Sequence, residues 1–265
     1  MIGRLEELVG APVRLEELKH KPGRRRILRV VGTRRRAIVK VYASGRAPDV
    51  AARLVALAAG PAEPRLPTVL HLDPELHLLV LTEVPGEPLR VAAFRDDLAA
   101  CRRAGAAVGS WHRAWFAAAP PPLRSHTAER EFELLDERAR DASPATARTV
   151  RRQAEQLRGD WPVSTVVHRD LYEEQILIGD RIGLIDLDDA AVGPPELDLG
   201  NLLAHLERLE HSSGRSLAEA TRTLRDGYET TGPDLDRDLL DRCRRLSLLR
   251  LACIHAEPHL VPDDV

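Results

Sequence analysis

The stretch from residue 166 to residue 187 restricts the fold of this chain more than any other part of the sequence. It contains two short apolar runs, Ile176–Ile178 and Arg181–Ile185, with the dipeptide Gly179-Asp180 between them. Apolar runs separated by a two-residue turn of this composition predict a β-hairpin. We therefore expect an antiparallel pair of strands in the second half of the chain.

The turn also predicts which residues of the hairpin face each other. Pairing the residues next to the turn places Gln175 opposite Leu184, and it makes Asp186 a diagonal neighbour of Gln175, roughly 7–8 Å away. Asp170 precedes the first strand, so three oxygen-bearing side chains converge at one edge of the hairpin. Oxygen ligands of this kind suit Mg²⁺, which keeps several waters and bridges to substrate phosphates. The spacing predicts a metal-phosphate site.

The triplet His168-Arg169-Asp170, the amide of Gln175 and the strand-borne Asp186 also form a familiar set. Here the sequence resembles the aminoglycoside phosphotransferase and choline kinase family, relatives of the protein kinases. The resemblance implies an α+β, two-lobed protein-kinase-like fold, with a small antiparallel-sheet N-lobe and a larger helical C-lobe. It also implies ATP and Mg²⁺ as cofactors and a small-molecule acceptor as substrate.

The same resemblance implies a role for each residue of the set. Asp170 would orient or deprotonate the attacking hydroxyl, and Gln175 and Asp186 would hold Mg²⁺. His168 would be a structural residue of the catalytic loop. Asp198 lies in a following segment that also resembles the family, and it would brace that loop.

Lysine is rare in this chain and therefore informative where it occurs. The only lysines are Lys19, Lys21 and Lys40. The run Ala37–Tyr42 matches the strand that carries the phosphate-binding lysine in this superfamily, and alternation puts Ile38 and Lys40 on one face. Lys40 would reach the α- and β-phosphates of ATP, with Ile38 above the adenine. The alternative is a surface lysine on an edge strand.

Two further segments are expected to contact the nucleotide. The turn at residues 20–24 contains a single glycine, so Lys21 and Arg24 would supply charge to the phosphates; a solvated basic turn is the alternative. Glu83 and Val84 lie where the family has its hinge, and their backbone groups would pair with the adenine edge.

The remaining sequence predicts a strand-rich first third and a helical remainder. We expect strands at 13–19, 26–31, 37–42, 68–72 and 76–81, and helices at 48–59, 91–118, 127–141, 144–158 and from about 196 to the end. A change in character after residue 84 predicts an N-terminal nucleotide-binding lobe, 1–84, and a helical C-terminal lobe with the catalytic loop and substrate site, 85–265.

The chain departs from the kinase pattern in its first long helix. A kinase lysine normally pairs with a glutamate on that helix, but residues 48–59 contain no glutamate, and Asp49 is a short and poorly placed substitute. Asp186 is followed by Leu187 and then by Asp188 and Asp189, which would add a second metal ligand, contact the substrate, or remain solvated.

Acidic residues cluster around the motif and suggest a cationic acceptor such as an aminosugar or choline. They would contact the substrate directly, although a solvated acidic face is the alternative. They are Glu173, Glu174, Asp188, Asp189 and Glu196.

Three functions fit these observations. The first is a kinase that phosphorylates a hydroxyl of an aminosugar, sugar or amino alcohol. The second is a kinase-like nucleotide- or partner-binding module with reduced or no catalysis, and the third is a peptide-modifying kinase of a biosynthetic pathway. The net charge of −2 and an aromatic content of 3% favour neither a specific nucleic acid nor a membrane as partner.

The sequence also indicates where the protein works. The charged amino terminus does not resemble a signal peptide, and Cys101, Cys243 and Cys253 lack metal-ligand spacing. We expect reduced thiols and a cytoplasmic location; the sequence predicts no oligomeric state.

Overall fold

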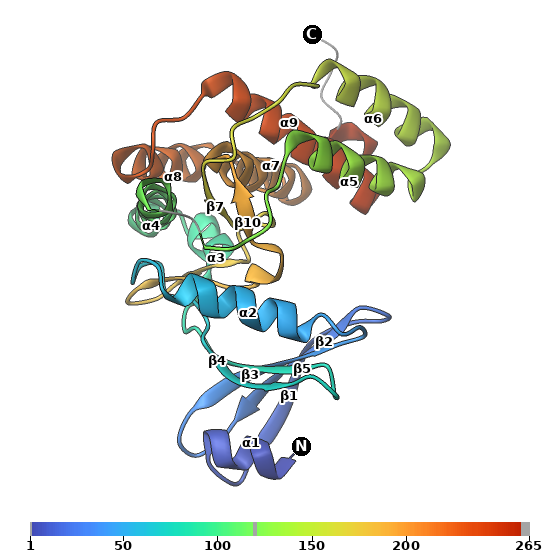
Figure 1. Ribbon diagram of the computed structural model, residues 1–265. Helices are drawn as coiled ribbons and strands as arrows, with labels where there is room; N and C mark the ends of the chain where they lie inside the picture. The colour runs from blue at the N-terminus through green and yellow to red at the C-terminus, as the bar shows by residue number, and fades with distance from the viewer. Residues whose placement is uncertain (1, 119–120, 261–265) are drawn as a thin grey trace.

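The computed structural model describes residues 2–118 and 121–260. A five-stranded antiparallel sheet forms the N-terminal part, and helices dominate the rest of the chain (Figure 1). The predicted α+β, two-lobed protein-kinase-like fold is therefore confirmed. The division at residue 84 stays a prediction, and the last five residues of the expected C-terminal helical region lie outside the described residues.

The sheet has the strand order β1-β2-β3-β5-β4, and every neighbouring pair is antiparallel. Two helices cover its two faces (Figure 1). The elements of this part are α1 (Ile2–Val9), β1 (Arg14–Lys21), β2 (Arg25–Val31), β3 (Arg36–Tyr42), α2 (Ala47–Ala58), β4 (Val69–Asp73) and β5 (Leu78–Thr82).

Alternation along β3 and β5 separates the two faces of the sheet. Val39 and Val80 pack in the cluster with α1, whereas Leu79 and Leu81 pack in the cluster with α2. Lys40 follows the second pattern, because successive strand residues point to opposite faces. It lies on the central strand β3 rather than on an edge strand.

Helices make up most of the rest of the chain, and a group of short strands lies between α6 and α7. The elements are β6 (Glu87–Pro88), α3 (Leu89–Phe94), α4 (Leu98–Ala117), α5 (Ala128–Arg140), α6 (Pro144–Gln156), β7 (Thr165–Val167), β8 (Ile176–Ile178), β9 (Ile182–Leu184), η1 (Leu187–Asp189), β10 (Ala191–Gly193), α7 (Pro195–Ser213), α8 (Ala218–Thr231), α9 (Arg237–His255) and η2 (Pro258–Leu260). None of the helices that the structure describes is long and apolar enough to cross a membrane.

Two helix predictions need correction. The single helix expected at 91–118 is two helices, because Asp96 adopts a left-handed backbone conformation with φ 54° and Asp97 caps α4 by accepting the N–H of Ala100 at 3.0 Å. Helix α1 was not predicted. Its signal is the burial of Leu5 and Val9, which are four residues apart and share one helical face.

The predicted register of the β8–β9 hairpin is wrong by one residue. Ile178 pairs with Ile182 rather than with Arg181, so the loop has three residues instead of two. Arg181 leaves the ladder, and its Nε donates to Glu63 Oε1 at 3.0 Å. Consequently the backbone of Gln175 pairs with Ile185, whose N–H donates to its carbonyl at 3.0 Å.

Gly183, in β9, joins the hairpin to two segments of the N-terminal part. The backbone N–H of Arg65, beyond α2, donates to the carbonyl of Ile182 at 2.8 Å, and the carbonyl of Arg65 accepts from the N–H of Leu184 at 2.9 Å. A Cβ atom on Gly183 would lie 2.3 Å from Val84 Cγ1. Because glycine leaves this space free, the segment after α2 and the segment after β5 both rest on the same point of the hairpin.

Helices α4 and α8 approach closely at a glycine, which yields a stability prediction. A Cβ on Gly105 would lie 1.9 Å from the carbonyl oxygen of Leu224. Gly105→Ala is therefore expected to lower the free energy of unfolding by about 1–3 kcal/mol, because overpacking outweighs the better helix propensity of alanine. Urea denaturation measures this change.

Gly3→Ala in α1 is the matched control, since no heavy atom lies within 4 Å of the added Cβ. It should leave stability unchanged or raise it by up to about 1 kcal/mol. Equal stability of the Gly105 variant and the wild type would contradict the close approach of the two helices.

Candidate active site

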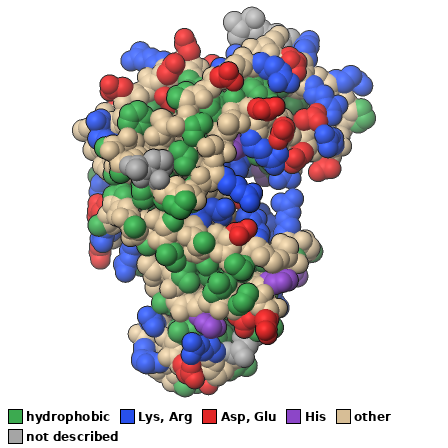
Figure 2. All heavy atoms as spheres, in the orientation of Figure 1, with side chains coloured by type: hydrophobic (Ala, Val, Ile, Leu, Met, Phe, Trp, Pro, Cys, Tyr) green, Lys and Arg blue, Asp and Glu red, His purple; other side chains and the backbone are tan. Residues whose placement is uncertain are grey.

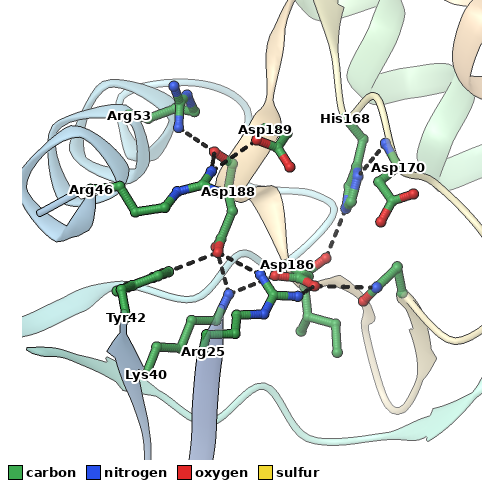
Figure 3. Close-up of polar contacts among 12 residues, drawn as sticks. Arg25, Lys40, Tyr42, Arg46, Arg53, His168, Asp170, Asp186, Asp188 and Asp189 are labelled. Atoms are coloured by element: carbon green, nitrogen blue, oxygen red, sulfur yellow. Dashed lines mark hydrogen bonds and ion pairs between the residues drawn. The ribbon is translucent and has the colours of Figure 1, made fainter. Parts of the chain in front are cut away.

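Two cations and two carboxylates form a compact cluster between the sheet and the β8–β9 hairpin (Figure 3). Lys40 Nζ, from β3, lies 2.7 Å from Asp186 Oδ1 and 2.5 Å from Asp188 Oδ1. Arg25, at the start of β2, places its two terminal nitrogens 2.5 Å from Asp186 Oδ2 and 2.7 Å from Asp188 Oδ2. Each cation therefore bridges both carboxylates.

The backbone at Asp186 explains why these carboxylates meet. Asp186 has φ 63° and ψ 42°, a left-handed conformation that ends the strand, and the 3-10 turn Leu187–Asp189 follows at once. Burial raises the pKa of Asp186, but Lys40 and Arg25 outweigh it and hold the pKa well below its usual range. The carboxylate is thus kept ionised inside a cationic setting.

Asp188 is the more buried member of the cluster, with 2% of its side chain exposed, against 14% for Asp186. The hydroxyl of Tyr42 also donates to Asp188 Oδ2, at 3.0 Å. The backbone carbonyl of Asp188 accepts Arg46 Nη2 at 3.2 Å and a hydrogen bond from Arg53 of α2. These partners replace the solvation that a buried carboxylate loses.

The His168-Arg169-Asp170 triplet forms a tight loop, with Arg169 at φ 71°. The N–H of Asp170 donates to His168 Nδ1 at 3.3 Å, so His168 Nε2 carries the proton and donates to the carbonyl of Ile185 at 2.7 Å. Asp170 itself is exposed. In Figure 3 its carboxylate lies apart from the ion-pair cluster, and no hydrogen bond to it is present among the described residues.

Asp198, in the first turn of α7, binds the backbone of this loop. Its two oxygens accept the N–H groups of His168 and Arg169 at 2.6 and 2.7 Å, and His112 Nε2 lies 3.1 Å from Oδ2. Burial raises the pKa of Asp198, but the His112 hydrogen bond and nearby charges lower it more, so the net shift is downward. Tyr228 in turn donates to His112 Nδ1 at 2.7 Å.

Gln175 and Asp186 lie side by side, as the predicted metal site requires. Gln175 Nε2 is 3.5 Å from Asp186 Oδ2. One amide and one carboxylate suit Mg²⁺, because this ion takes its other ligands from phosphates and water. No group of three or more His, Cys, Asp or Glu side chains arranged for a metal occurs in the described part of the chain.

The expected nucleotide contacts lie around this cluster. Lys21 and Arg24 are exposed at the turn between β1 and β2, and partial desolvation, together with Lys19 and Arg25, lowers the pKa of Lys21. The side chain of Glu83 accepts Arg29 Nε at 2.8 Å. No hydrogen bond to the backbone of Glu83 or Val84 is present among residues 2–118 and 121–260.

The acidic residues near the motif do not form one surface. Glu174 pairs with Arg90, and Asp189, 55% exposed, pairs with Arg46 at 2.9 Å. Glu196 accepts the N–H of Asp236 at 2.8 Å. Asp188 points into the cation cluster, so the geometry gives it partners other than the substrate that we expected.

Glu173, like Glu196, is buried with one carboxylate oxygen that has no hydrogen-bond partner in the described structure. In Glu173 this oxygen is Oε2, and the residue is 7% exposed. Burial raises its pKa. His205 Nδ1 lies 3.9 Å from this oxygen, and the His205 ring stacks on Tyr172 at 4.7 Å between centroids.

Several residues of the cluster were missed in the sequence. Tyr42 had a signal, because it lies two residues after Lys40 and shares its strand face. Arg25 had none that set it apart from its arginine neighbours. Arg46 and Arg53 had no signal, because the kinase pattern predicts an acidic residue on helix α2. His112 had none, because it lies far from the motif in the sequence.

Comparison with known proteins agrees with this geometry. The profile of the phosphotransferase enzyme family matches residues 17–251. This chain belongs to that family. A search of curated proteins gave no match.

Solved structures of other proteins show the same fold at low sequence identity. A choline kinase from Cryptosporidium parvum is 12% identical with a TM-score of 0.68, covering 96% of this chain and 87% of that one. A macrolide 2′-phosphotransferase from Brachybacterium faecium is 17% identical with a TM-score of 0.60, covering 97% and 94%. A spectinomycin phosphotransferase in complex with ADP and spectinomycin is 14% identical with a TM-score of 0.65, covering 97% and 86%.

Proposed function

We propose that this phosphotransferase-family protein transfers the γ-phosphate of ATP to a hydroxyl of a small soluble molecule, in the class of aminosugars, sugars and amino alcohols. The observation that carries the proposal is the exposed carboxylate of Asp170, which has no hydrogen-bond partner among the described residues and lies on the loop that leads to the Gln175–Asp186 pair. A free acid beside a metal-phosphate site is what a hydroxyl acceptor needs.

In this proposal Gln175 and Asp186 hold Mg²⁺, which neutralises charge on the phosphates when it is bound. Lys40 and Arg25 contact the phosphates. Both cations now neutralise Asp186, so a nucleotide would take over their charge as it binds. Asp170 orients the acceptor hydroxyl and receives its proton, while His168 and Asp198 keep the loop in shape.

The adenine base of the nucleotide would lie between the two parts of the molecule. Ile38 shares the face of Lys40, and the free backbone groups of Glu83 and Val84 would pair with the adenine edge. Lys21 and Arg24 would add charge at the phosphate end. Figure 2 shows Lys and Arg side chains gathered where the surface is hollowed between the sheet and the helical part, which supports a nucleotide lobe at 1–84 and an acceptor lobe at 85–265.

Glu173 supports an acceptor with a positive charge. Its buried oxygen without a hydrogen-bond partner lies three residues after Asp170, and an ammonium group would satisfy it. Glu174, Asp188 and Asp189 are already paired with lysine or arginine. Glu196, by contrast, accepts the N–H of Asp236 through Oε1 alone. Of the two acids with an unpartnered oxygen among the described residues, Glu173 is closer to Asp170 in the sequence, and we assign it to the acceptor.

Calorimetric titration of ATP, with and without Mg²⁺, tests the nucleotide site. The wild type is expected to bind ATP more tightly with Mg²⁺. Asp186→Ala should lose this Mg²⁺-dependent gain, about tenfold or more in dissociation constant. It should still bind metal-free ATP, because Lys40 and Arg25 each lose a carboxylate partner and remain available to the phosphates.

Asp180→Ala, at an exposed position in the β8–β9 loop, is the control and should behave as the wild type. Retention of the full Mg²⁺ effect in Asp186→Ala would rule out Asp186 as the metal residue. Absence of ATP binding in every variant would favour the kinase-like binding module instead.

A further inference from the structure

Lys40 lacks the helix glutamate that the kinase pattern provides as its partner. In kinases a glutamate on the first helix holds the phosphate-binding lysine. Helix α2 of this chain has Asp49 as its acid, and Asp49 is exposed in the first turn. Lys40 is nevertheless 5% exposed, so its ammonium must be held by another group.

Asp188 has the contacts that such a group needs. Its Oδ1 binds Lys40 at 2.5 Å, while Arg25 and the Tyr42 hydroxyl occupy Oδ2 at 2.7 and 3.0 Å. With both oxygens bonded to protein and 2% of the side chain exposed, this carboxylate is oriented from three sides. Asp186 is more exposed and lies beside Gln175, so it is the acid with access to a metal.

Helix α2 contacts the same residue from its other side. Arg53 of α2 and Arg46 at its N-cap both donate to the backbone carbonyl of Asp188. The helix therefore offers arginine where kinases offer glutamate, and the acceptor has moved to the segment after the metal residue. This exchange keeps a link between helix and lysine, since α2 holds Asp188 and Asp188 holds Lys40.

We propose that Asp188 is the positioning residue that anchors Lys40 over the nucleotide phosphates in place of a helix glutamate, with Arg53 connecting this anchor to α2. The proposal rests on the phosphate-binding role of Lys40 proposed above. Asp188 acts through Lys40 and contacts neither metal nor substrate. Asp186 is released from Lys40 and Arg25 when the metal-nucleotide complex binds, whereas Asp188 keeps Lys40 in place.

A double-mutant cycle on nucleotide affinity tests the link between Asp188 and Lys40. Asp188→Asn is expected to raise the dissociation constant of Mg-ATP about tenfold in the wild-type background, in line with loss of a charge-assisted contact. In a Lys40→Met background the same change should have a clearly smaller effect, because the lysine is gone and only the contact of Asp188 with Arg25 remains. A metal ligand would instead show its full effect in both backgrounds and would shift the Mg²⁺ dependence.

Tyr42→Phe provides a milder variant in case Asp188→Asn folds poorly. It removes one of the three donors to Asp188 and leaves both charges in place. A smaller loss of Mg-ATP affinity is expected, and it should be reduced further in the Lys40→Met background. Asp180→Asn in the hairpin loop is the matched control for an aspartate change at an exposed position.

Nitrogen NMR of the lysine side chains tests the anchor without nucleotide. The chain has three lysines, so ¹⁵Nζ-labelled protein gives few signals, and Lys40→Met assigns the one that matters. Asp188→Asn is expected to shift the Lys40 ammonium signal and to speed its hydrogen exchange more than Asp186→Asn does, because Asp186 is the more exposed of its two partners. The exposed Lys19 and Lys21 serve as internal references.

The two measurements separate failure of the anchor from failure of the proposed function. If Mg-ATP does not bind to the wild type, the nucleotide proposal fails, and the NMR result still shows whether Asp188 holds Lys40. A Lys40 signal that responds to Asp186→Asn but not to Asp188→Asn would overturn the anchor. So would an equal effect of Asp188→Asn on affinity with and without Lys40.

Discussion

Asp170→Asn is expected to reduce phosphoryl transfer by about 10²–10⁴-fold, the range that a positioned general base contributes. The amide has nearly the same shape as the carboxylate but does not accept the proton of the acceptor hydroxyl. Nucleotide affinity should be retained, because the contacts to Asp186 and Lys40 do not involve Asp170. Turnover is measured with whichever acceptor responds in a screen of aminosugars, sugars and amino alcohols.

The fold should tolerate this change. Asp170 is exposed, and its one hydrogen bond among the described residues is made by its backbone N–H. The melting temperature should therefore match that of the wild type and of Asp180→Asn. Full transfer activity in Asp170→Asn would show that another group takes the proton.

Asp198→Asn is expected to have the largest effect on stability, lowering the free energy of unfolding by about 3 kcal/mol at pH 7. The wild-type carboxylate accepts from two backbone N–H groups and lies beside His112 Nε2. An asparagine keeps one acceptor oxygen and places an NH₂ group against donors. Because the side chain is fully buried, water does not replace the lost acceptor.

The effect of Asp198→Asn should also depend on pH in a defined direction. The pKa of Asp198 is lower in the folded protein than the value of about 3.9 in an unfolded chain, so its contribution is complete above that value. It is lost as the pH falls through the folded-state pKa. The stability difference between wild type and variant should therefore shrink as the pH falls below about 4.

Urea unfolding at several pH values measures this difference. Asp241→Asn on α9 is the control, since its carboxylate is 53% exposed and pairs with Arg244 on the surface. It should change stability by less than about 1 kcal/mol at any pH. A pH-independent loss in Asp198→Asn would contradict an ionised Asp198.

The residues predicted from sequence are those whose signal is local. Strand alternation is a period of two, and it correctly placed Ile38 and Lys40 on one face. The hairpin was also predicted, but its register was not, because the pairing depends on whether Arg181 stays in the ladder. In the fold Arg181 leaves the ladder and pairs with Glu63, which is 118 residues away and gives no local signal.

The cluster around Asp188 had no local signal. Arg25 and Asp188 are separated by 163 residues, and neither belongs to a recognisable spacing with the other. Arginines are abundant in this chain, so one that binds a buried carboxylate looks like its solvated neighbours. Only the fold distinguishes Arg25 from Arg24 and Arg26, because it places one of three adjacent arginines against both aspartates.

The junction at Gly183 bears on how the two parts can move. Arg65 and Val84 both contact this hairpin position, so we expect relative motion of the parts to be a rotation about it. An adenine base bound beside Val84 would lie at the axis of that rotation, so it would keep its contacts as the two parts separate. The phosphates would lie away from the axis, where the ion pairs of Arg25 and Lys40 hold the two parts together. Release of the product nucleotide would then begin with its phosphates, and its adenine base would leave last.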